Sequence, residues 1–255
     1  MNKIYLMRST VSIFIFFMAT LNSVKADSNF AIPNLNAFSF FETSSEPLIV
    51  DGITSAYKLG AVGAEINVLL SKNINITGAL GFGYAPNQSI SYSDANFNGN
   101  IQSVYTKIGI VYHLTDLPKR TSVDLLIEAE NREVKGDNLT GFRRGTALTG
   151  KISSGLNTTN LMMKATQNLF GPHLTSSIGL GLSKWEFNGT GHAWTPTAME
   201  IEKNANGNGI DPFAEVMLAI KGERYSYLFK LRRNKISADN TVYIDQLQFQ
   251  ISKSF

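Results

Sequence analysis

The sequence predicts an all-β fold, a transmembrane up-and-down barrel of antiparallel strands. Two observations carry this prediction. Apolar and polar residues alternate along many segments, which is the pattern of strands with one apolar and one polar face. Beyond residue 26, no apolar run approaches the roughly 18 residues of a membrane-spanning helix. A membrane barrel combines both properties, because only every second residue of its strands faces lipid.

The alternation does not by itself identify the medium around the strands. In the segment 62–70, Val62, Ile66 and Val68 share one face, whereas Glu65 and Asn67 share the other. A soluble β-sandwich produces the same pattern, with the apolar face as its core. A soluble periplasmic β-protein is therefore an alternative to the membrane barrel.

The first 26 residues have the layout of a secretory signal peptide. Lys3 and Arg8 precede an apolar stretch at 11–21, which is too short to span a membrane, and Ala26 ends a small-residue cleavage site. We expect a cleaved signal peptide over 1–26 and one barrel domain over 27–255. The leader contains Lys3, Arg8, Lys25 and no acid, so the net charge of +3 becomes 3 − 3 = 0 without it. No basic excess then indicates a nucleic-acid partner.

The C-terminal segment alternates and stops on an aromatic residue. Leu247, Phe249, Ile251 and Phe255 alternate with polar residues, although Lys253 stands where an apolar residue is usual. This segment resembles the closing strand of Gram-negative outer-membrane β-barrels, whose terminal Phe is recognised by the barrel-insertion machinery. The resemblance implies an outer-membrane location, an insertion signal made of these four residues, and contact with the barrel-assembly machinery during insertion.

The pattern predicts ten strands, an even number that places both chain ends in the periplasm. The expected strands are 37–42, 57–70, 74–84, 101–113, 120–133, 144–156, 174–187, 210–220, 225–236 and 241–255. Between the sixth and seventh strands, the segment 158–170 is predicted to form a short periplasmic helix, capped by Thr158 or Thr159 and ended by Gly171-Pro172. Eight or twelve strands are the alternatives. The polar segments 43–56, 85–100, 134–143 and 188–209 are predicted to be mobile outer loops.

Nine charged residues are predicted to face the lumen. Five acids and four bases make up this set: Glu65, Asp124, Glu128, Glu130, Glu215, Lys107, Lys151, Lys230 and Arg232. Because buried charges must be paired or hydrated, a balanced set favours a salt-bridged plug over a selective channel. Gly179 and Gly181 are expected to face this crowded interior and to leave room for neighbouring side chains.

No catalytic or metal motif stands out. The chain has no cysteine, and its three histidines, His113, His173 and His192, show no metal-ligand spacing, so no metal and no cofactor are predicted. The sequence favours a non-enzymatic envelope role with an unidentified extracellular partner. The alternatives are a narrow pore for small solutes and a lipid- or peptide-hydrolysing enzyme, for which only His192 lies in an outer segment.

A basic cluster is predicted near the outer rim of the barrel. Arg132, Arg143 and Arg144 are expected to gather there. Arginine binds phosphate with two parallel hydrogen bonds, so these residues are candidates for contact with lipopolysaccharide and other outer-membrane lipid.

Overall fold

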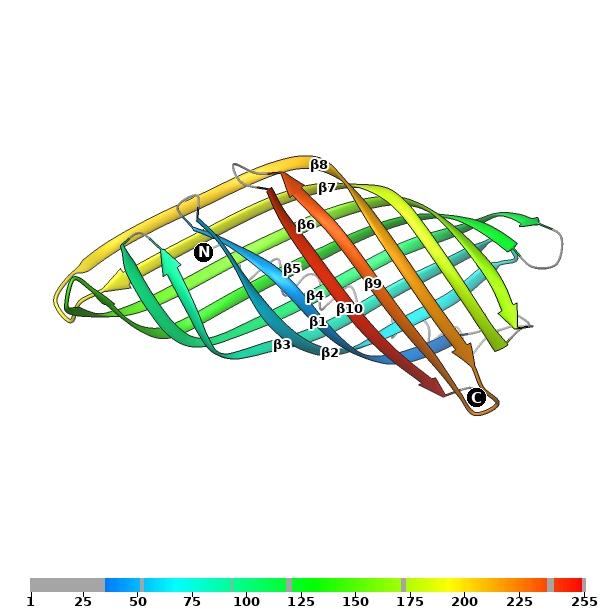
Figure 1. Cartoon of the computed structure of the whole chain (residues 1–255), viewed down its shortest axis with the longest axis horizontal. Coiled ribbons are helices and arrows are strands. Elements are labelled where there is room, and N and C mark those ends of the chain that lie inside the picture. Colours follow the sequence, from blue (N-terminus) through cyan, green and yellow to red (C-terminus); the bar gives the residue numbers. More distant parts are fainter. Residues whose placement is uncertain are drawn as a thin grey trace, which may run out of the picture. The chain divides into compact units, whose positions relative to one another are not determined.

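The computed structural model describes residues 35–50, 53–92, 94–117, 121–170, 173–237 and 241–253. The expected signal peptide and Phe255 lie outside these ranges. The described residues form ten strands (Figure 1): β1 (Leu35–Val50), β2 (Ile53–Ser71), β3 (Ile74–Tyr92), β4 (Ala95–Leu117), β5 (Thr121–Arg143), β6 (Thr146–Phe170), β7 (Leu174–Trp194), β8 (Met199–Lys221), β9 (Tyr225–Ser237) and β10 (Thr241–Lys253). No helix in this part of the chain is long and apolar enough to cross a membrane.

Each strand pairs with its sequence neighbour, and β1 pairs with β10 to close the barrel. In the closing seam, Phe41 lies opposite Phe249 and Glu42 lies opposite Gln248 in an antiparallel register. The prediction of an up-and-down barrel with ten strands is confirmed. Closure leaves the sheet without a continuous unpaired edge, which is how a β-structure satisfies its backbone groups in lipid.

The periplasmic helix predicted over 158–170 is wrong. The segment is the second half of β6, and Met162 pairs with Leu126 of β5 and with Gly181 of β7. The helix-favouring composition of Leu161-Met162-Met163 is overridden because strands on both sides supply backbone hydrogen-bond partners. Leu161 and Met163 face outward, whereas Met162 is buried inside, so three successive apolar residues hide the alternation.

The segments predicted as mobile loops at 43–56, 85–100, 134–143 and 188–209 are also largely strand where the structure describes them. On β8 the outward Asn204, Asn206 and Asn208 alternate with inward Gly207 and Gly209. A composition of Asn and Gly is typical of turns, but here it reflects a polar outer surface and a close-packed inner one. The β5–β6 and β7–β8 hairpins consequently reach farther than the ends of β1, β2, β9 and β10 on the same side (Figure 1).

The outer surface of the barrel changes polarity part way along the strands. On β7, the outward Ile178, Leu180 and Leu182 are 54–66% exposed, and they are followed by outward Lys184 and Glu186. Neighbouring strands change in the same way, from Ile210 to Asn208 on β8 and from Ala129 to Asn131 on β5. An apolar belt therefore surrounds one part of the barrel, and a polar surface covers the longer hairpins.

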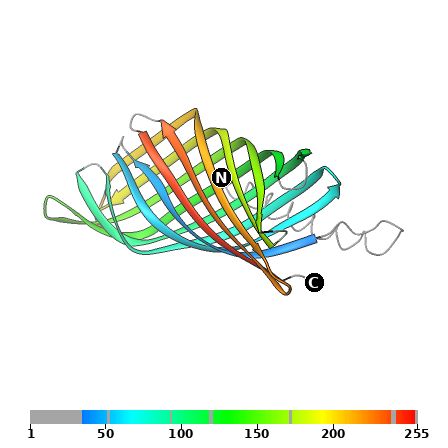
Figure 2. The same cartoon turned by 45° about the vertical axis from the view of Figure 1, so that its right-hand side comes forward.

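The inside of the barrel changes in the opposite sense. At the height of the apolar belt, the interior of the barrel is lined by buried charged side chains, among them Lys107 and Glu128. Within the longer hairpins it is apolar, and a buried cluster includes Phe97, Ile101 and Ile152. Figure 2 shows these hairpins from a second side. A part that is apolar outside and polar inside fits lipid, whereas a part that is polar outside and apolar inside fits water.

Candidate functional site: a charged network across the lumen

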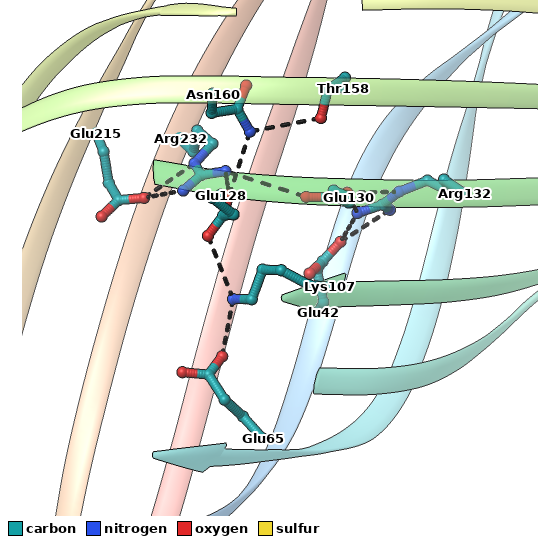
Figure 3. A network of polar contacts seen from close by, with 10 residues as sticks. All are labelled: Glu42, Glu65, Lys107, Glu128, Glu130, Arg132, Thr158, Asn160, Glu215 and Arg232. Carbon is teal, nitrogen blue, oxygen red and sulfur yellow. Dashed lines mark hydrogen bonds and ion pairs between the residues drawn. The ribbon is translucent and has the colours of Figure 1, made fainter. Parts of the chain in front are cut away.

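Charged and amide side chains from seven strands meet inside the barrel (Figure 3). We call this group the lumen network; it comprises Glu42, Glu65, Lys107, Glu128, Glu130, Arg132, Thr158, Asn160, Glu215 and Arg232. Alternation places each of these side chains on the inner face of its strand.

Glu128 of β5 is the centre of the lumen network. It accepts a hydrogen bond of 2.5 Å from Nη1 of Arg232 and one of 3.2 Å from the Asn160 amide, and the Lys107 ammonium lies 3.8 Å away. Arg232 also donates to Glu215 of neighbouring β8 through Nε and Nη2, at 2.9 and 2.8 Å. Since β9 and β5 are four strands apart around the barrel, the Arg232–Glu128 contact bridges the lumen.

Arg132 forms a second centre on the same strand as Glu128. Its two terminal nitrogens donate to Glu42 of β1 at 2.9 and 3.0 Å, and Nε and Nη2 donate to Glu130 at 3.2 and 2.8 Å. The guanidinium also lies 4.9 Å from the ring centre of Tyr105. The predicted position of Arg132 at the outer rim is therefore wrong: its side chain is 3% exposed and ties β5 to β1.

Lys107 links the lumen network to β2. Its ammonium lies 2.9 Å from Glu65, which also accepts a 3.1 Å hydrogen bond from the amide of Gln250. Every pair described so far involves side chains that are at most 14% exposed. Isolated charges at such depth would be costly, so each carboxylate is stabilised by a guanidinium or ammonium partner.

The structure brings six of the nine predicted lumen charges into the lumen network. These are Glu65, Lys107, Glu128, Glu130, Glu215 and Arg232. Lys230 faces the same interior, but no carboxylate among the described residues lies within 4.0 Å of its ammonium. Gln248 lies in register beside Lys230 and is 1% exposed, and neither polar atom of its amide has a hydrogen-bond partner in the described part of the chain.

Two predicted lumen residues lie outside the lumen network. Asp124 is buried on the inner face of β5, as predicted, but near the β4–β5 turn, where it contacts Nδ1 of His113 at 2.6 Å and Lys164 at 3.9 Å. Lys151 points outward and pairs with Asp137 at 2.8 Å, with both side chains about half exposed. Lys151 was predicted to face inward because the expected helix interrupted the strand after residue 156. In the structure β6 is continuous, so Lys151 and Leu161, ten residues apart, both face outward.

Sequence reasoning did not place four members of the lumen network inside the barrel: Glu42, Arg132, Thr158 and Asn160. A signal existed for Arg132, since it follows Glu128 and Glu130 at the two-residue spacing of one strand face. Glu42 follows outward Phe41 in a weakly patterned segment, and Asn160 fell inside the expected helix.

The remaining predicted residues have clear positions. His192 lies on the outer wall of β7, in register with Lys151 and Glu202, and its ring stacks with Trp194 at 6.3 Å. His173 contacts the Lys221 carbonyl at 3.2 Å.

Two further predicted groups lie on opposite sides of the barrel wall. On the outer face of β10, Leu247 and Ile251 are exposed and Phe249 packs 4.8 Å from Phe229. The two glycines predicted to face the interior do so. A Cβ at Gly179 would lie 2.3 Å from the Met162 sulfur, and one at Gly181 would lie 2.6 Å from Phe213.

Comparison with solved structures identifies the fold class. The outer-membrane protease OmpT of Escherichia coli matches with a TM-score of 0.53 at 9% identity, over 89% of this chain and 97% of that chain. The translocator domain of the autotransporter NalP of Neisseria meningitidis matches with a TM-score of 0.47 at 12% identity, over 97% of this chain and 98% of that one. The attachment invasion locus protein Ail of Yersinia pestis matches with a TM-score of 0.36 at 7% identity, over 88% and 100%.

OmpT is an outer-membrane protease, and the present chain, a closed barrel of antiparallel strands, shares its fold. Neither a protein-family model nor a curated protein matches the sequence.

Proposed function

We propose that this chain is an outer-membrane β-barrel of the cell envelope with a non-enzymatic role, in which the longer hairpins present a rigid surface to the outside. The opposite change of polarity on the two sides of the wall carries this proposal. The apolar belt fits the hydrocarbon layer, and the hairpins beyond it have the polar exterior and apolar interior of a water-exposed β-structure.

The lumen network supports a closed barrel over an open channel. Arg232 and Glu128 reach across the lumen, and Arg132 and Glu42 join β5 to β1. Such contacts restrain the walls relative to one another and occupy the space through which solutes would pass. The proposed partners are membrane lipid, including lipopolysaccharide, and the barrel-assembly machinery, which would read Leu247, Phe249, Ile251 and Phe255.

Folding residues 27–255 from urea into lipid vesicles tests the membrane assignment. We expect folding only with lipid or detergent, and a gel mobility that changes when the sample is heated. A chain that stays monomeric and folded without any amphiphile would instead support the soluble periplasmic alternative. Planar-bilayer recordings test closure, and we expect no steady conductance of the size given by open porins.

A narrow water-filled path is the second candidate, and one observation favours it. Lys230 and Gln248 face the lumen side by side without direct polar partners among the described residues. Buried polar groups of this kind are normally satisfied by ordered water. The water permeability of vesicles that contain the protein tests this path. We expect a rate of water flow above that of empty vesicles. Q248L should reduce this rate, whereas K151A, the control on the outer wall, should leave it unchanged.

A hydrolase using His192 is less well supported. The His192 ring is on the outer wall, away from the lumen network, and its register neighbours are Lys151 and Glu202. Any hydrolysis of lipid or peptide by the purified protein that survives H192A excludes that enzyme.

A further inference from the structure

A compact group of charges lies at the tips of two long hairpins and takes no part in the lumen network. Asp94 stands in the β3–β4 turn, and Arg143 and Arg144 lie at the β5–β6 turn. Nε of Arg143 is 2.5 Å from one Asp94 oxygen, and Nε of Arg144 is 3.3 Å from the other. One carboxylate therefore holds two guanidinium groups side by side.

The backbone at Arg144 is unusual for this residue type. Arg143 pairs with Thr146, so Arg144 and Gly145 form a two-residue hairpin loop, with φ of 48° and 88°. A loop with two positive φ values favours Asn, Asp or Gly at its first position, because a longer side chain is strained there. An Arg at this position is unfavourable for the turn, and local strain of this kind is commonly found at functional sites.

The orientation of the two arginines suits a tetrahedral anion. Each arginine approaches Asp94 through its Nε, and a guanidinium held there has further N–H groups on its terminal nitrogens for a second anion. The Arg144 side chain is 84% exposed, and the adjacent Phe142 is 65% exposed. Paired guanidinium groups match the oxygen spacing of sulfate and phosphate, and an exposed aromatic ring offers a flat apolar surface to a sugar.

The hydrogen bond from Arg143 lowers the pKa of Asp94 below its ordinary range. A lowered pKa keeps the carboxylate ionised, and the arginines paired with it, until the pH falls below the range in which an ordinary Asp is protonated.

The tips lie far from the apolar belt. On β5 the belt ends at Ala129, and the next outward residue, Asn131, is 143 − 131 = 12 residues from Arg143. At about 3.3 Å per residue and a tilt near 45°, that distance is roughly 28 Å along the membrane normal. The lipid phosphates at the membrane surface are therefore out of reach, and a ligand must come from outside.

We propose that Asp94, Arg143 and Arg144 form a binding site for the sulfate or phosphate groups of an external anionic polysaccharide. The outward direction of the site rests on the proposed outer-membrane orientation, but its binding chemistry does not. Asp94 acts as a positioning residue, and the two arginines contact the anion.

Binding of a short dextran sulfate chain to the detergent-folded protein tests the proposal, with uncharged dextran as the ligand control. We expect R143A/R144A to lose at least about tenfold in affinity, because two charge-assisted contacts disappear. K135A/K151A is the matched control, since it also removes two exposed cations that are paired with acids. We expect it to bind within about twofold of the unaltered chain.

D94N separates positioning from net charge. Removing the negative charge makes the tip more basic, so a purely electrostatic patch would bind dextran sulfate more tightly. Since the arginines lose their common anchor, we expect weaker binding. R143K/R144K keeps the charge and the fold, and it should also bind weakly because Lys lacks the planar pair of donors.

Three results would overturn the proposal: no binding of dextran sulfate by the unaltered chain, equal losses in R143A/R144A and K135A/K151A, or tighter binding by D94N. The binding assay uses protein folded in detergent micelles and does not depend on insertion into a bilayer. A failure to bind dextran sulfate can therefore be told apart from a failure of the chain to fold into lipid vesicles. A second arm adds lipopolysaccharide vesicles, whose binding we expect to survive R143A/R144A. Its loss would assign the arginines to the cell's own lipid instead.

Discussion

At the scale of single residues, Arg232 and Arg233 show how the side of the wall decides what a charge does. Arg232 is 2% exposed and bridges Glu128 and Glu215 inside the barrel. Arg233 points outward and forms a two-point contact with Asp245 at 2.6 and 2.8 Å. Consecutive residues of one strand thus form an enclosed ion pair and a solvent-exposed one.

Replacing Arg232 with Met should destabilise the barrel by about 3–5 kcal/mol, because Glu128 and Glu215 would lose their main partner while remaining enclosed. The measurement is the free energy of unfolding in urea from lipid vesicles. R233M is the matched control on the adjacent residue and should change that free energy little, since exposed pairs contribute little. Equal effects of the two substitutions would argue against a cross-lumen bridge.

Residue-level prediction from sequence worked where the strand was recognised without interruption. Glu128 and Glu130 were assigned inward because β5 alternates clearly, and the same rule applied two residues further would have included Arg132. Lys151 was misplaced because an inferred helix cut β6 in two. The pairing of Lys107 with Glu65 could not be predicted, since it depends on how far β2 and β4 are shifted along β3.

At the scale of elements, glycine allows large side chains to pack against the inner wall. Gly181 on β7 lies under the ring of Phe213, and Gly207 and Gly209 on β8 lie under the indole of Trp185. Trp185 in turn donates to Asp211 at 2.8 Å, and Asp211 accepts from the Ser237 backbone at 2.6 Å. These contacts connect β7, β8 and β9 close to Phe213, where the pairing of β8 with β9 begins.

Gly181→Ala should cost about 1–3 kcal/mol of unfolding free energy, because the added Cβ would lie 2.3 Å from the Leu161 carbonyl oxygen and 2.6 Å from Phe213. The control is Gly60→Ala on β2, where the nearest atoms would be 4.0 Å away. Urea unfolding midpoints of both variants give the comparison. If G60A lowered the unfolding midpoint as much as G181A, the loss of a strand glycine alone would explain both effects. Close packing at Gly181 would then not be needed to explain the result.

The strand count was predictable and the strand ends were not. The alternation and the even-number rule gave ten strands, but the long Asn- and Gly-containing segments were assigned to loops because these residues favour turns. In a barrel of unequal strands they form the water-facing continuation of β7 and β8. The β6 error has the same origin, since local propensity was weighed without the two neighbouring strands.

At the scale of the whole barrel, the reversal of polarity between the belt and the longer hairpins predicts where charge is tolerated. Leu182 and Asn188 lie on the same outer face of β7, six residues apart, on either side of the change. Leu182→Arg should destabilise the lipid-folded barrel by about 2–4 kcal/mol, because an arginine there would face hydrocarbon. Asn188→Arg should be near neutral, and vesicle-based unfolding measures both. Two neutral substitutions would contradict a lipid-facing belt.

Strands of unequal length also give the barrel a sloping outer rim. β6 has 25 residues, whereas β9 and β10 have 13 each, and the β5–β6 turn reaches past the nearby ends of β9 and β10 (Figure 1). With the longer hairpins outward, as proposed, these two places are unequal targets for an antibody approaching intact cells. A peptide epitope inserted between Arg144 and Gly145 would stand farther from the membrane than the same epitope inserted after Ser237, and surface polysaccharide would shield it less. A sloping rim predicts that antibodies label the epitope at Arg144 on living cells more strongly than the epitope at the end of β9.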